Sequence, residues 1–93
     1  MTVRVTVTDD LIAAGVRHCP SCCPVGRAVA GLFPDARRVS VVPVRGDRWH
    51  VRVYGPGRAY KSARLPGEAC RWLDCYVNGV AVEPIEFDLT FED

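Results

Sequence analysis

The stretch CPSCCPVGRAVAGLF, from Cys19 to Phe33, holds three of the five cysteines and predicts the first long helix of the chain. Pro24 suits the first helical position, with Cys23 or Ser21 as the cap, because its missing N–H is one of the groups that a helix start leaves unpaired. The apolar residues that follow recur at i, i+3, i+4 and i+7, which is the spacing of one buried stripe. They are Val25, Ala28, Val29 and Leu32. Because Phe33 is followed by a proline, we expect the helix to end there and to pack one side against a core.

The cysteine spacing also allows a zinc site. Cys19-x-x-Cys22 has the spacing of half such a site, and Cys70 and Cys75 are the candidates for the other half. They lie in a predicted helix, where five residues at about 100° each place them roughly 140° apart, on different faces. The two cannot both bind one ion, so we expect no metal and no cofactor. A site built from Cys19, Cys22 and His18 with one distant cysteine stays an alternative.

A thiol redox role is the other alternative for the Cys19-x-x-Cys22 turn, because a helix N-terminus lowers the pKa of a nearby thiol. In a glutaredoxin-like fold, however, this motif directly follows the first strand and the chain ends in a helix. Here residues 9–18 intervene and the last segment is a predicted strand. A disulfide framework is disfavoured by the odd number of cysteines and by the lack of a visible signal peptide. We therefore expect reduced cysteines that serve as small core residues.

Composition predicts one domain spanning residues 1–93. A hydrophobic content of 48% is sufficient for one small core. No apolar run approaches the ~20 residues of a membrane span, and no internal repeat is present. We therefore expect a soluble, intracellular protein that does not insert into a membrane.

The net charge of +1 hides an asymmetry along the chain. Residues 1–65 hold 11 of the 12 Lys and Arg, whereas residues 66–93 hold 7 of the 11 Asp and Glu. The simplest explanation of this asymmetry is that basic and acidic side chains pair within the domain. The second explanation is a homodimer in which the basic part of one chain faces the acidic part of the other. A nucleic-acid partner ranks third, because an acidic stretch in so small a domain opposes the phosphate backbone. We therefore predict no nucleic-acid partner.

Period-two alternation predicts strands at both ends of the chain, in residues 2–8 and 85–92. We expect these strands to pair, with Arg4 facing Glu86 or Asp88. Between them the pattern indicates a short helix after Thr8, the helix from Pro24, a hairpin and a second main helix. The hairpin joins residues 38–44 and 48–54 around a Gly-Asp turn, residues 55–62 form a loop, and the second main helix spans residues 67–78.

This order of elements predicts an α+β fold. We expect a single two-layer domain with about four mainly antiparallel strands, and with two main helices and one short helix on one face of the sheet. No Ser, His and Asp arrangement and no paired-carboxylate site stands out, so we predict that the chain is not an enzyme. Exposed arginine and tyrosine side chains dominate interface energetics and are the predicted partner-binding residues. They are Arg48, Arg52, Tyr54, Arg58 and Tyr60.

Three motifs resemble a family of small uncharacterised proteins of actinobacteriophages and actinobacterial prophages. They are Cys23-Pro24-Val25 at a helix start, Leu65-Pro66-x-Glu68-Ala69 at the next, and Val82-Glu83-Pro84-Ile85-x-Phe87-x-Leu89 at the end. Each marks a helix start or a strand, so the resemblance carries architecture more safely than function. The family pattern has Cys-x-x-Cys-Pro, whereas here the cysteine before Pro24 is preceded by Cys22 and Cys19. This departure weakens the case for a metal or redox role inherited from the family.

Within such phage proteins, the chain resembles an early host-toxic protein. This resemblance implies a non-enzymatic protein in the host cytoplasm that binds a host protein and inhibits or redirects it. The implied partner is a DivIVA-type scaffold, a coiled-coil protein of the growing cell pole. The implied outcome is growth inhibition of the host and protection of the infected cell from further infection.

Overall fold

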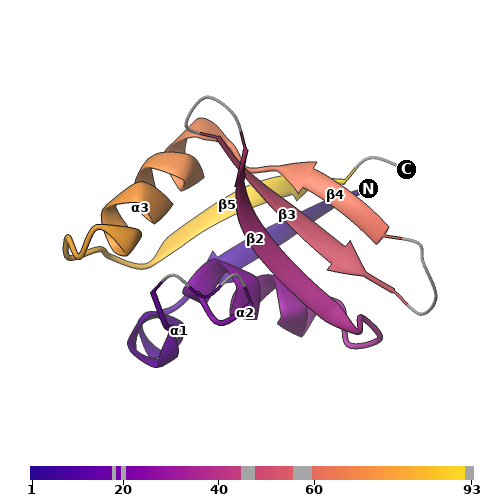
Figure 1. Cartoon of the computed structure of the whole chain (residues 1–93), viewed down its shortest axis with the longest axis horizontal. Coiled ribbons are helices and arrows are strands. Elements are labelled where there is room, and N and C mark those ends of the chain that lie inside the picture. The colour runs from indigo at the N-terminus through magenta and orange to yellow at the C-terminus, as the bar shows by residue number, and fades with distance from the viewer. Residues whose placement is uncertain (18, 20, 45–47, 56–59, 92–93) are drawn as a thin grey trace.

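The computed structural model describes residues 1–17, 19, 21–44, 48–55 and 60–91. Their helices and antiparallel strands confirm the predicted α+β class (Figure 1). The elements are β1 (Thr2–Val7), α1 (Asp9–Ala14), α2 (Pro24–Leu32), β2 (Arg38–Val44), β3 (Arg48–Tyr54), β4 (Tyr60–Arg64), α3 (Gly67–Val77) and β5 (Ile85–Thr90).

The strands form two antiparallel sheets instead of one. β1 pairs with β5, and β2, β3 and β4 form a three-stranded sheet in that order. The additional strand is β4, where the sequence predicts a loop up to Ser62. That prediction is wrong from Tyr60 onward, because β4 is short and polar and is held by its pairing with β3. Helix α2 packs against both β1 and β2 and so joins the two sheets.

The first and last strands pair as the sequence predicts. Val5 lies opposite Phe87, and both are buried in the core. On the exposed side, Arg4 donates hydrogen bonds at 3.2 Å to Asp88 and also at 3.2 Å to Glu86. The alternation of each strand therefore separates a buried apolar side from an exposed charged side.

The helix starts are also confirmed. Cys23 caps α2, and its Sγ accepts a hydrogen bond from the backbone N–H of Gly26 at 3.4 Å. Thr8 caps α1, where its Oγ1 accepts from the N–H of Leu11 at 3.3 Å. These caps satisfy N–H groups that have no partner within the helix. They explain why local sequence was enough to place both helix starts.

The cysteines divide into a disulfide and three free thiols. Cys19 and Cys22 form a disulfide, so the expectation of reduced cysteines is wrong for this pair. The turn between them brings their Cα atoms to 5.1 Å, which is within the usual range for a disulfide. Cys23 and Cys70 are buried, as expected of small core residues, whereas Cys75 is exposed. The prediction that Cys70 and Cys75 lie on different faces of one helix is thereby confirmed.

One hydrophobic core contains residues from both sheets and from α2 and α3.

Among the described parts of the chain, no helix combines the length and apolarity needed to cross a membrane.

Candidate functional site: the outer face of the three-stranded sheet

The three-stranded sheet has one face toward the core and one away from it. The core face carries apolar side chains such as Val41 and Val51, which are buried. We call the opposite side the outer face. Figure 1 shows no helix crossing in front of β2, β3 and β4. The outer-face positions are Arg38, Ser40, Val42 and Val44 on β2, Arg48, His50, Arg52 and Tyr54 on β3, and Ser62 and Arg64 on β4.

At one end of the outer face, Tyr54 lies between Arg38 and Tyr60 in the register of the three strands. The guanidinium carbon of Arg38 is 5.9 Å from the centre of the Tyr54 ring. This distance is that of a cation–π contact, in which the ring face attracts the cation. The contact orders one arginine and one tyrosine side by side on the surface.

The central row of the outer face consists of Ser40, Arg52 and Ser62. Ser40 alternates with the core residues Val39 and Val41, so its side chain lies on the outer side of the sheet. It is nonetheless only 3% exposed, and its Oγ has no hydrogen-bond partner within the described structure. A buried hydroxyl without a partner is unusual, because it has lost its bonds to water without replacement. No local sequence signal marks Ser40, since its burial depends on neighbouring strands.

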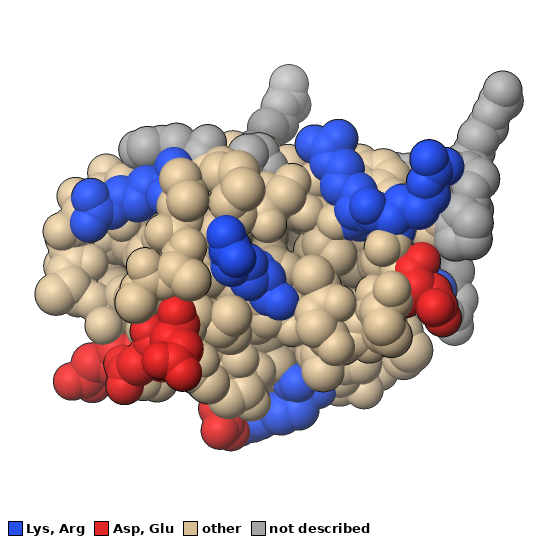
Figure 2. All heavy atoms as spheres, turned by 90° about the horizontal axis from the view of Figure 1, so that it is seen from below, with Lys and Arg blue, Asp and Glu red and all other residues tan. Residues whose placement is uncertain are grey.

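The strands of the outer face contribute charged side chains of one sign only. The three strands hold no Asp or Glu. Arg38, Arg48 and Arg64 are exposed, and Arg52 is half-buried. On the side of the molecule with α1 and α2, by contrast, basic and acidic side chains are interspersed (Figure 2). The outer face is therefore suited to a partner surface of negative charge.

Three of the predicted partner-binding residues, Arg48, Arg52 and Tyr54, lie together on the outer face. Tyr60 joins them by its backbone position opposite Tyr54. Arg58 lies outside the described residues. Arg48 is exposed as expected, but Arg52 and Tyr54 are half-buried. Their full exposure was wrongly predicted, because β3 is the central strand and has neighbours on both sides.

The contribution of β4 to this face is not predicted by the local sequence pattern. Ser62 and Arg64 lie on the outer side, whereas Ala63 and Leu65 are buried. This alternation begins at Tyr60 and is present in the sequence. It covers too few residues, after a Gly-Pro-Gly segment, to distinguish a strand from a loop without the pairing partner.

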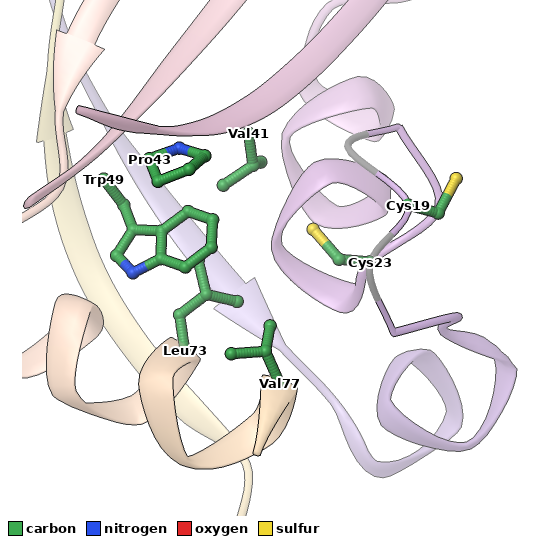
Figure 3. A pocket seen from close by; sticks show the side chains of 7 residues that line it. All are labelled: Cys19, Cys23, Val41, Pro43, Trp49, Leu73 and Val77. Atoms are coloured by element: carbon green, nitrogen blue, oxygen red, sulfur yellow. The ribbon is translucent and has the colours of Figure 1, made fainter. Parts of the chain in front are cut away.

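A separate apolar cleft lies on the other side of the sheet, between β2, β3, α3 and the turn before α2. Its volume is about 240 Å³, which is enough for one large apolar side chain. The Cys23 sulfur points toward the cleft, and the Cys19 sulfur points away from it (Figure 3). The Trp49 Nε1–H at its wall donates to Asp74 Oδ1 at 2.8 Å. The lining residues are Cys19, Cys23, Val41, Pro43, Trp49, Leu73 and Val77.

The thiol in this cleft is not an activated nucleophile. Burial raises the pKa of the Cys23 thiol, and the hydrogen bond from the Gly26 N–H only partly opposes that effect. Since the thiolate is the reactive form, burial keeps Cys23 in its unreactive form. Within the described residues, no group of three or more His, Cys, Asp and Glu side chains is arranged to hold a metal ion.

Comparison of the chain with protein-family models, with curated proteins and with solved structures finds no match.

Proposed function

We propose that this chain is a non-enzymatic protein-binding module that binds its partner through the outer face. The observation that carries the proposal is the alignment of Arg48, Arg52 and Tyr54 along one side of β3, on a face whose three strands hold no Asp or Glu and in front of which no helix of the described residues crosses in Figure 1. Arginine and tyrosine give interfaces much of their energy, because they combine a large contact area with polar groups. The neighbouring Arg38 and Arg64 extend the same chemistry to both outer strands.

The resemblance to actinobacteriophage proteins supplies the biological context of the proposal. We propose a phage protein that acts in the host cytoplasm, where it binds a host protein and inhibits or redirects it. The first candidate partner is a DivIVA-type polar growth scaffold. The proposal includes no nucleic-acid partner, no membrane insertion and no cofactor, and it is compatible with a homodimer.

The binding surface is tested by measuring the affinity of the purified chain for a purified DivIVA-type protein by biolayer interferometry. Arg48→Ala and Arg52→Ala are each expected to weaken binding about fivefold or more, as truncation of a central interface residue does. Arg17→Ala removes the same charge from an exposed position before α2 and is expected to bind like wild type. Equal affinities of wild type and both outer-face variants would contradict the assigned surface. Absence of binding by wild type would contradict the named partner.

The Cys19–Cys22 disulfide favours a second candidate function, which is thiol–disulfide exchange. In that reaction a partner thiolate attacks one sulfur of the pair, forms a mixed disulfide and releases the other sulfur as a thiolate. A second thiolate of the same partner then attacks the partner sulfur of the mixed disulfide and releases the remaining cysteine of the pair as a thiolate. Cys19 and Cys22 end as thiols, and the two partner thiols end as a disulfide. The same exchange in reverse lets the reduced pair convert a substrate disulfide to two thiols, and Cys19 and Cys22 then pair again.

An insulin-reduction assay with dithiothreitol as the electron donor separates the two functions. The binding-module proposal predicts that the wild-type chain adds no activity to that of dithiothreitol alone. Strong reductase activity that disappears in Cys19→Ser would establish the second function and remove the first as the main role.

A further inference from the structure

We infer that the central row of the outer face, Ser40, Arg52 and Ser62, is an oxyanion subsite for a carboxylate of an acidic protein segment. This inference rests on the proposed function and specifies the chemistry of the partner. Its basis is the position, the burial and the charge environment of the three side chains.

The register places the three side chains in one line across the sheet. Ser40 is the direct partner of Arg52 on one side, and Ser62 is its direct partner on the other. Adjacent strands lie about 4.8 Å apart, so both hydroxyls are close to the base of the arginine side chain. A guanidinium flanked by two hydroxyls offers several N–H and O–H donors to one anionic group.

Ser40 indicates a ligand more directly than the charges do. Its Oγ is buried and has no hydrogen-bond partner among the described residues, although Ser62 in the same row is half-buried. A structural role alone does not explain a serine at this position, since an alanine would occupy the same place in the sheet without leaving a polar group unpaired. A carboxylate oxygen bound at the row would accept the hydroxyl proton and remove that deficit. Because Ser40 is only 3% exposed, the neighbouring side chains must shift when the ligand binds.

Charge complementarity determines the class of partner. Arg38 and Arg64 lie in the rows on either side of Arg52, and the three strands contribute no carboxylate. A carboxylate is favoured over a nucleic-acid backbone, because the chain as a whole has a net charge of only +1. A long polyanion needs an extended basic surface, whereas a short acidic segment needs only the sheet.

The probe is a fluorescein-labelled peptide of twelve residues that alternates glutamate with serine, and the matched control peptide has glutamine in place of glutamate. Fluorescence anisotropy with the full chain is expected to show binding of the glutamate peptide and at least about tenfold weaker binding of the glutamine peptide, since charged hydrogen bonds are lost. Equal binding of the two peptides would overturn the inference. Tighter binding of a single-stranded oligothymidine than of the glutamate peptide would also overturn it.

Ser40→Ala separates a ligand role from a structural one. We expect this variant to bind the glutamate peptide roughly three- to tenfold more weakly, while its melting temperature stays the same or rises. Arg52→Gln is expected to lose at least about tenfold in affinity, and Arg17→Gln, which lies outside the outer face, is expected to bind like wild type. If Ser40→Ala fails to fold, Ser62→Ala makes the same test from the other side of Arg52. Wild-type affinity in the serine variant tested would overturn the subsite.

The failure of this inference is distinguishable from failure of the proposed function. If outer-face variants lose the DivIVA-type partner but the wild-type chain ignores the glutamate peptide, the binding surface stands and the carboxylate subsite is wrong. If the DivIVA-type partner does not bind but the peptide binds through Ser40 and Arg52, the subsite stands and the named partner is wrong.

Discussion

The guanidinium carbon of Arg38 lies 5.9 Å from the centre of the Tyr54 ring, across the pair of strands β2 and β3. This contact holds an exposed cation against a half-buried ring at one end of the outer face. It places one basic and one aromatic side chain next to each other at that end of the face. Its effects on stability and on binding can be measured separately.

Tyr54→Phe is expected to keep the cation–π contact and the partner binding that depends on it, because it keeps the ring that attracts the Arg38 guanidinium. Tyr54→Ala removes the ring. Its unfolding free energy is expected to fall by about 0.5–1 kcal/mol from loss of the cation–π contact, and to fall further because the ring no longer buries apolar surface. The measurement is urea unfolding followed by circular dichroism, together with affinity for the DivIVA-type partner. If Tyr54→Phe loses binding as completely as Tyr54→Ala, the hydroxyl and not the ring carries the contact.

Phe87→Ala is expected to cost about 3–5 kcal/mol of unfolding free energy, because Phe87 is 1% exposed and its truncation leaves a cavity in the core. It should therefore lose partner binding only because it unfolds. Arg52→Ala should lose binding and still melt near the wild-type temperature. Thermal melts by circular dichroism check both. A Phe87→Ala variant as stable as wild type would contradict the placement of β5 in the core.

Thiol titration of the unreduced, denatured chain is expected to detect three thiols, because Cys19 and Cys22 are paired. Full reduction should raise the number to five. The double variant Cys19→Ser with Cys22→Ser is expected to lose at most about 2 kcal/mol, since a disulfide that closes so short a loop constrains the unfolded chain only slightly. Five thiols before reduction would contradict the pairing.

The raised pKa of Cys23 predicts how stability depends on pH. The folded chain holds the thiol proton more tightly than the unfolded chain, because burial penalises the thiolate. The contribution of the protonated Cys23 thiol to the unfolding free energy is therefore complete below the ordinary thiol pKa of 9.0. It is lost as the pH rises from there through the raised pKa. The unfolding free energy of wild type should fall in alkali more steeply than that of Cys23→Ala. The comparison with Cys23→Ala is needed because burial also raises the pKa of Tyr76, which makes stability fall in alkali for the same reason.

Alkylation kinetics test the same burial. Iodoacetamide is expected to modify the exposed Cys75 first and Cys23 much later, and mass spectrometry of the digested chain identifies each site. Cys70, which is also buried, serves as the internal control for protection by burial alone. Modification of Cys23 ahead of Cys75 at neutral pH would show that its thiol is accessible and activated.

Local patterns in the sequence were sufficient for most of the elements. The alternation from Thr2 to Val7 and from Ile85 to Thr90 predicted two half-buried strands, and their opposite charges predicted the contacts of Arg4. Proline at the start and the cap at Cys23 predicted α2. These signals are reliable because they arise from hydrogen bonds and periodicities within a few residues along the chain.

What the sequence by itself determined was therefore the α+β class, the starts of α1 and α2, the end of α2, the β2 and β3 hairpin, and the exposed charged side of the terminal pair. Only the tertiary structure decided that Tyr60 to Arg64 form a strand, that the strands divide into two sheets, and that Ser40 is buried on the side facing away from the core. The pairing of Cys19 with Cys22 also needed the folded turn. The physical reason is that strand pairing, burial and disulfide formation each depend on which groups the folded chain brings together. The outer face, which unites side chains from three strands, is the product of such contacts.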